Sequence, residues 1–538
     1  MRRSWRLAAA ALFLAATLAG GLAGDRLLAL SDAARGGLHL YADLLEVAHQ
    51  RYGSEVRYRD LVYASIQGML RTLDPHTNFL SPEAYAQMRE KQQASFYGLG
   101  ILVGVRGGRL TVITPIEGTP ASRLGMRAGD VIDSIEGEPT SKMTLDEAVS
   151  KLKGPRGTEV RITIVRSGLP EPLELTVVRD EIPQTTVRYA YLIAPGTGYL
   201  AISDFARSTG DEVARALVRL REQGMERLIL DLRNNGGGLL DQAVDVADQF
   251  LSKGASIVET RGRTRDSRQA FDAAGRRPEL GLPLVVLVNG GTASASEIVS
   301  GAIQDHDVGL VVGTPTWGKG LVQTVYNLAY GAGLALTTAK YYTPSGRLIQ
   351  RDYHSYYDYY ARTDLDEAET KRPAPATDEV FRTDLGREVY GGGGITPDVE
   401  VEPTEFPPYL QFLLARAAFF NFGVDYASRH PELDRSWRPE PALLDEFARW
   451  VAERDIDDAE GVAKGLAEEA DRALALRQIR AEALASRFGV EASHQVLAEG
   501  DAQIQRALEL FPRAAELLAQ RRAKGYAPRV ARAEESRP

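Results

Sequence analysis

Two stretches of the sequence carry residue types that could together form a serine nucleophile and its base. Ser294 lies in the small-residue run 290–297, between an apolar strand pattern at 283–289 and a helical pattern at 298–304. Such a junction exposes a side chain and points backbone N–H groups at the helix start toward a neighbouring ligand. Ser294 could therefore be a nucleophile. Taken alone, however, the spacing of Ser294 and Glu297 favours a capping box, in which the hydroxyl only binds a backbone amide.

A serine nucleophile needs a neighbouring base, usually a histidine or a lysine whose pKa is lowered by burial. His306 ends the helix that begins at Ser294, and twelve residues of helix at about 1.5 Å each separate the two by roughly 18 Å. Lys319 is the better candidate, because it lies between glycines at 318 and 320 after a second buried strand pattern. Gln323 falls on the same face of the next strand and could orient the amine. Without Ser294, an ordinary surface turn would be the preferred interpretation of this Gly-Lys-Gly run.

Length and composition indicate several domains and argue against some classes of function. The chain has 538 residues, against the ~100 to 200 expected of one domain. Lys and Arg number 64 and Asp and Glu 73, a net charge of −9, which argues against a nucleic-acid partner because such binding needs a basic surface. The absence of cysteine excludes disulfides, cysteine metal sites and a thiol nucleophile. We expect neither a metal site nor a cofactor.

Residues 1–24 have the pattern of an export segment. Three arginines, at 2, 3 and 6, precede the apolar run 7–23, the charge order of a signal peptide or a short membrane anchor. The run is at the short limit for a spanning helix, so a cleaved and a retained segment both stay open. We expect an exported protein, periplasmic or on the outer face of the cytoplasmic membrane, that meets the membrane only through this segment.

The rest of the chain divides into four predicted regions. Helical spacing predicts an N-terminal helical region at 25–95, in which His76 is interpreted as a hydrogen-bonded turn residue. Short strands with glycine turns predict a small β domain at 96–181, and alternating strands and helices predict an α/β layer architecture at 182–404. Helical patterns return at 405–538. We expect these last helices to pack on a neighbour, with partner binding or oligomerisation as the alternative.

The β domain resembles a PDZ domain. The turn formed by Gly98, Leu99, Gly100 and Ile101, followed by strand and short-helix patterns in the family's order, carries the resemblance. In that family, backbone amides of the turn bind a peptide's terminal carboxylate while the peptide adds as a strand to the sheet edge. The resemblance implies that these four residues bind carboxyl-terminal tails. The alternative is a β domain with a glycine-rich turn and no ligand.

The serine and lysine stretches together resemble the active-site signature of the carboxyl-terminal processing peptidases, or tail-specific proteases. Residues 292–296, Thr-Ala-Ser-Ala-Ser, match the family's serine motif, and Lys319 follows Ser294 by 25 residues, as the family's base does. Further family motifs lie at 68–76, 231–238 and 342–347. Because several family motifs occur in the family's order, we now prefer a nucleophile to a simple helix cap as the interpretation of Ser294.

This resemblance implies an exported serine endopeptidase with a ClpP/crotonase-like α/β core, an inserted PDZ domain, and helical regions at both ends. Ser294 would be the nucleophile, Lys319 the base and Gln323 its positioning residue. Backbone amides of Ala295 and Gly237 would hold the oxyanion. Because a lysine of ordinary pKa near 10.4 is protonated at neutral pH, the site must desolvate Lys319. The substrates would be carboxyl-terminal tails of exported proteins.

Several alternatives stay open at this stage. The runner-up is a PDZ scaffold of the cell envelope with a decayed, inactive protease core, and a third reading is a Ser-His-Asp hydrolase that uses His306. We expect the chain to form a homo-oligomer, and an adaptor protein is a further candidate partner. The tyrosine-rich and glycine-rich segment 352–394 and the C-terminal helices lie outside the family's common core, and their purpose is open.

Overall fold

The computed structural model describes residues 32–276, 281–351 and 379–525. The predicted export segment at 1–24 and residues 352–378 of the segment of open purpose lie outside the described residues. Within the described ranges, no helix is both long enough and apolar enough to cross a membrane. The chain divides into two compact units, which are described separately below.

The smaller unit contains residues up to Ser81 together with Val325–Leu336. Its main described elements are α2 (Asp32–Arg51), α3 (Tyr58–Leu70) and β1 (Asn78–Leu80), which pairs with the first residues of β18 (Gly333–Tyr342). Between α3 and β1, the Asp74 carboxylate accepts the backbone N–H groups of His76 and Thr77 at 2.8 Å each. This places His76 in a hydrogen-bonded turn, as its sequence context predicts.

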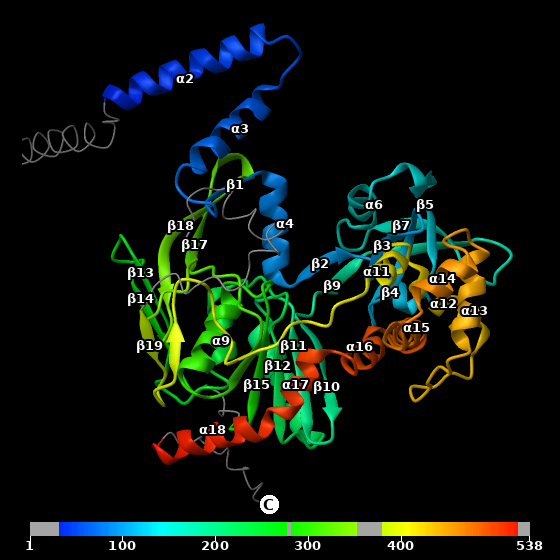
Figure 1. Ribbon diagram of the computed structural model, residues 1–538. Helices are drawn as coiled ribbons and strands as arrows, with labels where there is room; N and C mark the ends of the chain where they lie inside the picture. Colours follow the sequence, from blue (N-terminus) through cyan, green and yellow to red (C-terminus); the bar gives the residue numbers. More distant parts are fainter. Residues whose placement is uncertain (1–31, 277–280, 352–378, 526–538) are drawn as a thin grey trace, which may run out of the picture. The chain divides into compact units, whose positions relative to one another are not determined.

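The larger unit begins with α4 (Pro82–Gln93) and continues into the β domain (Figure 1). An antiparallel sheet has the order β3 (Ile101–Arg106), β4 (Arg109–Pro115), β5 (Val131–Ile135), β7 (Glu159–Val165), β8 (Leu173–Val178). The chain enters and leaves this domain through a paired β2 (Ser95–Gly98) and β9 (Asp180–Pro183). Its helices are α5 (Pro120–Arg123) and α6 (Leu145–Leu152). The predicted domain therefore folds around its own core, which includes Val112, Ile132 and Val160.

The α/β region is built on a six-stranded sheet. The strand order is β10 (Val187–Ala194), β11 (Thr197–Ile202), β12 (Arg227–Asp231), β15 (Leu284–Val288), β16 (Leu310–Gly313), β21 (Val399–Glu400). All pairs are parallel except β10 with β11. Parallel strands need crossovers, which here contain α7 (Thr209–Glu222), α8 (Leu240–Ala247) and α9 (Ala295–Asp305). Every residue of β15 is buried, as expected when both faces of a parallel sheet are covered.

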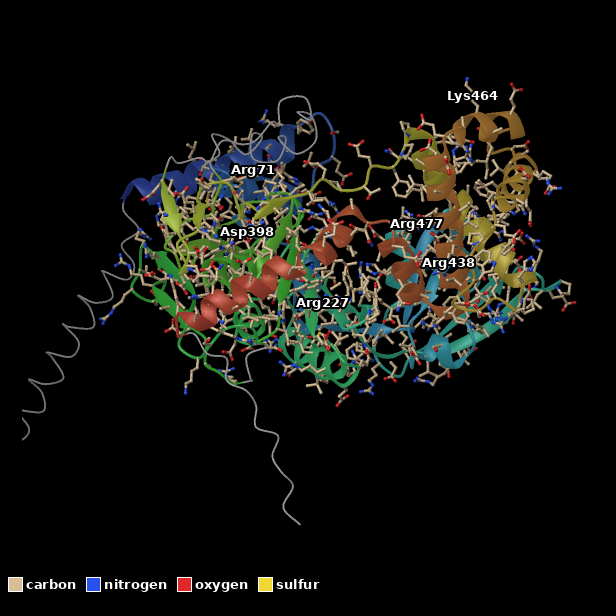
Figure 2. The ribbon with its side chains drawn as sticks, turned by 60° about the horizontal axis from the view of Figure 1, so that its bottom comes forward. Arg71, Arg227, Asp398, Arg438, Lys464 and Arg477 are labelled. Carbon is tan, nitrogen blue, oxygen red and sulfur yellow. The ribbon has the colours of Figure 1, made fainter. Side chains whose placement is uncertain are left out.

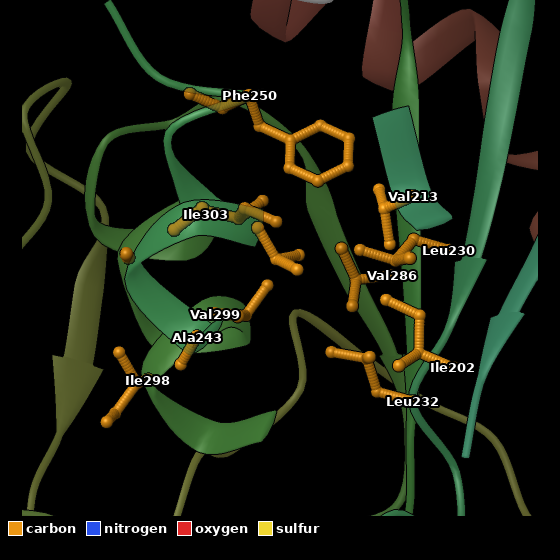
Figure 3. Packing of buried hydrophobic residues seen from close by; sticks show 14 of the residues in the cluster. Ile202, Val213, Leu230, Leu232, Ala243, Phe250, Val286, Ile298, Val299 and Ile303 are labelled. Carbon is orange, nitrogen blue, oxygen red and sulfur yellow. The ribbon is translucent and has the colours of Figure 1, made fainter. Parts of the chain in front are cut away.

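Alternate residues of the central strands point to two different apolar layers. Figure 3 shows Leu230 and Val286 of the sheet among Val213 of α7, Ala243 of α8 and Val299 of α9. Beside this layer, strands β13 (Ser256–Gly262) and β14 (Gln269–Asp272) pair with each other, and β13 also pairs with the last residues of β18. A short hairpin joins β19 (Val380–Arg382) to β20 (Glu388–Tyr390).

The C-terminal region is helical, as predicted, and it packs in two places. Its helices are α11 (Pro408–Ala415), α12 (Ala418–Arg429), α13 (Leu443–Ala452), α14 (Ala459–Gly465), α15 (Glu469–Phe488), α16 (Val490–Ala498), α17 (Ala502–Glu509) and α18 (Phe511–Ala523). Helices α11 to α15 share a core around Phe422 and Phe447. Helices α17 and α18 cover the second face of the six-stranded sheet, where Ile504 and Leu517 join Val285 in one apolar cluster. Arg227 of β12, labelled in Figure 2, also lies over the Phe511 ring of α18, 5.1 Å from its centroid.

Candidate active site

Ser294 lies at the turn between β15 and α9, where the sequence predicts it. Its backbone has φ 56° and ψ −114°, a conformation that is costly for a residue with a side chain. A sharp strand-to-helix turn of this kind exposes a serine hydroxyl in α/β-hydrolases. Ser294 lines a pocket of 370 Å³, and so do Lys319 and Gln323. The fold therefore brings the predicted nucleophile, base and positioning residue to one cavity.

The predicted contact between Lys319 and Gln323 is present. Lys319 Nζ donates to Gln323 Oε1 at 3.0 Å, because the two side chains project from the same side of the segment that enters β17 (Leu321–Asn327). The hydroxyl of the buried Tyr341 lies against the carbonyl oxygens of both catalytic candidates, with 3.2 Å to that of Ser294 and a shorter hydrogen bond to that of Lys319. Tyr341 thus joins the two segments on one side of the pocket.

Glu297 joins the same two segments from inside the protein. Its side chain is completely buried, and its Oε2 accepts the backbone N–H groups of Ser294 at 2.7 Å and Lys319 at 2.9 Å. Its Oε1 accepts the N–H of Gly318 at 2.7 Å and the hydroxyl of Thr316 at 2.5 Å. Burial raises the pKa of Glu297, while these hydrogen bonds oppose that rise by favouring the carboxylate. The sequence predicts Glu297 only as part of a helix cap and misses its contact with the lysine segment.

The two predicted oxyanion residues, Ala295 and Gly237, lie next to each other, but the amide of Gly237 is already hydrogen-bonded. Ala295 is the first residue of α9. Gly237 has φ 94°, and a Cβ on it would lie 2.8 Å from both Ser294 Cβ and Ala295 N, so only glycine fits. However, the N–H of Gly237 donates to Asn235 Oδ1 at 2.9 Å. In this conformation the Gly237 amide is already bonded, and it would have to leave Asn235 to bind a substrate oxygen.

His306 does not line the Ser294 pocket. Its Nδ1 lies 2.8 Å from Asp384 Oδ2, and its Nε2 lies 2.6 Å from the carbonyl oxygen of Ser256. Both ring nitrogens are therefore held at the far end of α9, which disfavours the Ser-His-Asp alternative. Within the described ranges, no group of three or more His, Asp or Glu side chains could hold a metal ion.

The predicted carboxylate-binding turn is only partly exposed to a groove. Gly98 ends β2, and the Leu99 side chain lies in the core of the β domain. Gly100 has φ 80° and passes so close to Thr119 that a Cβ would lie 2.2 Å from it. Ile101 begins β3 and is the member of the four that lines a groove of 670 Å³.

This groove borders the Ser294 pocket. It is lined by β3, by Val149 and Lys153 of the α6 segment, and by α4. Lys91 of α4 and Asp204 line both the groove and the Ser294 pocket, and the two side chains form an ion pair at 2.6 Å. The groove and the pocket thus share one wall.

Comparison with known proteins agrees with this arrangement. Residues 196–354 match peptidase family S41, and residues 111–166 match the PDZ domain. A carboxy-terminal-processing protease of Bartonella bacilliformis is 41% identical over 314 residues, which cover 58% of this chain and 72% of that protein. A carboxyl-terminal-processing protease of Synechocystis is 40% identical over 303 residues, 55% of this chain and 70% of that protein. The chain therefore belongs to the carboxyl-terminal processing proteases, serine-type peptidases of family S41 that here carry a PDZ domain.

Proposed function

We propose that the protein cleaves carboxyl-terminal tails by acyl transfer, with Ser294 as nucleophile and Lys319 as base. The observation that carries this proposal is the shared pocket, in which Lys319 Nζ is bonded to Gln323 beside Ser294. Ser294 Oγ attacks the peptide carbonyl carbon, and its proton passes to neutral Lys319 Nζ. The tetrahedral intermediate then expels the amine, which takes that proton. Water hydrolyses the resulting ester by the same steps, with Lys319 again accepting and returning a proton.

The base must be neutral before it can accept a proton. Lowering the pKa of a lysine from its usual 10.4 by ~3 units disfavours the charged form by about 4 kcal/mol. Gln323 suits this requirement because its amide oxygen accepts a hydrogen bond without the negative charge that would stabilise ammonium. The developing oxyanion would be held by the amide of Ala295 and, after it leaves Asn235, the amide of Gly237.

The proposed substrates are exported proteins with an unstructured, apolar carboxyl terminus. The peptide groove supports this because β3 offers a strand edge and α6 lines its other side. A tail bound there would reach Ser294 past the wall formed by Lys91 and Asp204. The apolar lining of the pocket, which includes Phe205, Leu239 and Leu321, favours an apolar side chain near the cleaved bond. Export to the periplasm or the outer membrane face rests on the sequence of residues 1–24.

Purified protein and two versions of one peptide test this function. The peptide has an apolar tail and ends either in a free carboxylate or in an amide. We expect cleavage of the free acid, a higher KM for the amide, and no cleavage by Ser294→Ala or Lys319→Ala. His306→Ala should remain active. Absence of cleavage by the natural sequence would favour the scaffold alternative, and activity of Lys319→Ala would contradict the Ser-Lys pair.

Two glycine variants, Gly100→Ala and Gly137→Ala, test tail binding in the groove separately from bond cleavage at Ser294. Gly100→Ala forces a Cβ into Thr119 directly before Ile101, which lines the groove, so we expect KM to rise by about tenfold or more. Gly137→Ala is the control, because Gly137 has a similar φ of 78° with nothing within 4 Å of the added Cβ. Equal KM values for the two variants would contradict the proposed peptide site.

A further inference from the structure

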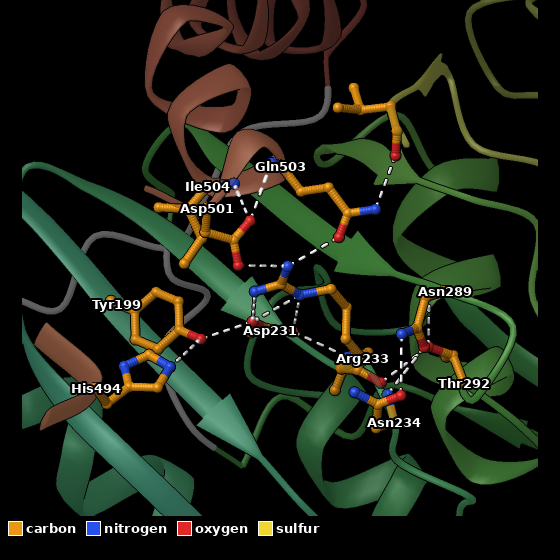
Figure 4. A network of polar contacts seen from close by, with 12 residues as sticks. Tyr199, Asp231, Arg233, Asn234, Asn289, Thr292, His494, Asp501, Gln503 and Ile504 are labelled. Atoms are coloured by element: carbon orange, nitrogen blue, oxygen red, sulfur yellow. Dashed lines mark hydrogen bonds and ion pairs between the residues drawn. The ribbon is translucent and has the colours of Figure 1, made fainter. Parts of the chain in front are cut away.

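The C-terminal helices contact the turn that carries Gly237, and Figure 4 shows these contacts as a continuous network. Arg233 lies in this turn, residues 231–238. Its Nε lies 3.1 and 3.0 Å from the two carboxylate oxygens of Asp231, and its Nη2 donates to Asp231 Oδ2 at 2.6 Å. Its Nη1 donates to Asp501 Oδ2 and to Gln503 Oε1, both at 2.8 Å. Two nitrogens of the guanidinium are therefore bonded to Asp231 and the third to the α17 segment.

The two acceptors on the α17 segment are themselves fixed. Asp501 is the N-cap of α17, and its Oδ1 accepts the backbone N–H groups of Gln503 at 2.9 Å and Ile504 at 3.1 Å. Its other oxygen remains for Arg233. Gln503 is buried, and its Nε2 donates to the carbonyl oxygen of Val401 at 2.7 Å. Both acceptors therefore face Arg233 in one defined orientation.

Helix α16 is linked to Asp231 indirectly, through Tyr199 of β11. Tyr199 donates its hydroxyl proton to Asp231 Oδ2 at 2.6 Å. His494 of α16 lies 3.4 Å from the same hydroxyl oxygen through Nε2 and 2.9 Å from the Tyr191 hydroxyl through Nδ1. Because the Tyr199 proton is already given to Asp231, His494 Nε2 is the donor to Tyr199, and Tyr191 donates to Nδ1. The Asp231 carboxylate is thus bonded from the sheet, from the turn and, through Tyr199, from α16.

The same turn is bonded to the segment of the nucleophile. The carbonyl oxygen of Asn235 accepts the N–H of Ala293 and the hydroxyl of Ser296, both at 2.9 Å. The Asn235 side chain holds the amide of Gly237, which lies against Ser294. Only one residue separates Arg233 from Asn235. A shift of Arg233 would therefore be passed directly to the amides beside the nucleophile.

We infer that Asp501 and Gln503 are positioning residues for the active site, which fix Arg233 and through it the 231–238 turn against Ser294. This inference rests on the proposed reaction of Ser294 and Lys319. It gives the C-terminal helices a role in the reaction in addition to covering the sheet. The substrate groove lies on other elements, so the positioning residues act on the bond-making step and not on tail binding.

Asp501→Asn tests the inference with a matched control. Asparagine is as good an N-cap as aspartate, so α17 keeps its cap while Arg233 loses a charged acceptor. Asp458→Asn makes the same change at the N-cap of α14, where Asp458 Oδ1 accepts the N–H of Gly461 at 2.6 Å. We expect kcat to fall by about tenfold or more in Asp501→Asn, with KM within about twofold of the natural sequence and no change in Asp458→Asn.

Two further measurements separate positioning from a general loss of structure. Gln503→Met removes one acceptor of Arg233 without touching the cap, and it should lower kcat in the same direction. A peptide boronic acid, which forms a tetrahedral adduct with a serine nucleophile, should bind Asp501→Asn about tenfold more weakly, while the cleaved product peptide binds unchanged. All assays are made well below the melting temperature of each variant.

Three outcomes would overturn the inference. They are kcat within about twofold of the natural sequence in both Asp501→Asn and Gln503→Met, an equal loss in Asp501→Asn and Asp458→Asn, or a loss that lies only in KM. If Asp501→Asn does not fold, Gln503→Met decides alone. Ser294→Ala is assayed in parallel: if it is active, the proposed reaction itself is wrong, whereas an inactive Ser294→Ala beside unaffected positioning variants contradicts this inference only.

Discussion

Ser294 and Lys319 donate their backbone N–H groups to the same atom, Oε2 of the buried Glu297. The two residues are 25 positions apart in the chain, and this shared acceptor fixes the distance between their backbones. A carboxylate that is buried and bonded in this way cannot shift without leaving donors unpaired. The distance between Ser294 and Lys319, the proposed nucleophile and base, is therefore fixed by hydrogen bonds of the main chain.

The variant Glu297→Gln tests whether catalysis depends on the two hydrogen bonds that the Glu297 carboxylate accepts, and not only on the burial of this side chain. The variant keeps the shape of the side chain but replaces one accepting oxygen with an NH2 group, so at least one backbone N–H loses its partner. We expect kcat to fall by about tenfold to a hundredfold and the free energy of unfolding to fall by ~1 to 3 kcal/mol. Steady-state kinetics and urea unfolding measure the two effects.

Glu147→Gln is the control for that variant. Glu147 occupies the same place in the capping box of α6, where it accepts the Thr144 N–H at 2.8 Å on the exposed surface of the PDZ domain. We expect kcat within about twofold of the natural sequence. If Glu297→Gln keeps a kcat in that range as well, the shared acceptor does not determine the geometry of the pair.

Gln323→Glu should move the pH dependence of cleavage. A carboxylate in place of the amide oxygen, 3.0 Å from Lys319 Nζ, favours the charged amine and raises its pKa. Because only neutral Lys319 accepts a proton, the rising limb of the kcat/KM profile should move to higher pH by about one unit or more. Gln323→Leu, which adds no charge, should lower kcat without that upward movement. Identical profiles for the two variants would show that Gln323 does not contact the functional base.

Gly237→Ala should abolish cleavage because the added Cβ lies 2.8 Å from Ser294 Cβ, Ala295 N and the carbonyl oxygen of Ala293. We expect a loss of kcat of about a hundredfold or more, the scale of losing an oxyanion donor. Gly224→Ala controls for the backbone, since Gly224 has a φ of 91° and nothing within 4 Å of its added Cβ. A similar kcat for both variants would mean that the approach of Gly237 to Ser294 is not needed for catalysis.

His494 should make the folded protein less stable in mild acid. Burial lowers the pKa of His494 from 6.5 to about 4 in the folded chain. Between these values the unfolded chain binds a proton that the folded chain does not, so the free energy of unfolding falls as pH decreases from 6.5 to 4, by at most about 3 kcal/mol. His494→Gln keeps a donor and an acceptor but cannot be charged, and should lose this part of the pH dependence. Urea unfolding at several pH values would detect an unchanged slope, which would contradict the assignment.

The sequence predicts those features of the structure that depend only on residues close together in the chain. The small-residue turn at Ser294, the strand after Lys319 and the two-residue period that aligns Gln323 are all local, because strand and helix geometry repeat over a few residues. For the same reason, the order of strands and glycine turns predicts the PDZ domain, and alternating strands and helices predict the parallel sheet. The spacing of 25 residues between Ser294 and Lys319 predicts a nucleophile and its base only because it matches a known family. Local geometry alone does not predict that the two residues lie together.

The tertiary structure decides which groups meet across long stretches of chain. Arg233 and Asp501 are 268 residues apart, and neither periodicity nor turn chemistry relates them. The contact of Glu297 with Lys319 likewise needs β15 and β16 to lie side by side, which brings the ends of their segments together. The sequence alone therefore determined the chemical groups of this protein and the local turns that expose them. Only the packed fold decided which buried acceptors hold those turns, because hydrogen-bond partners in a core are chosen by burial and not by distance along the chain.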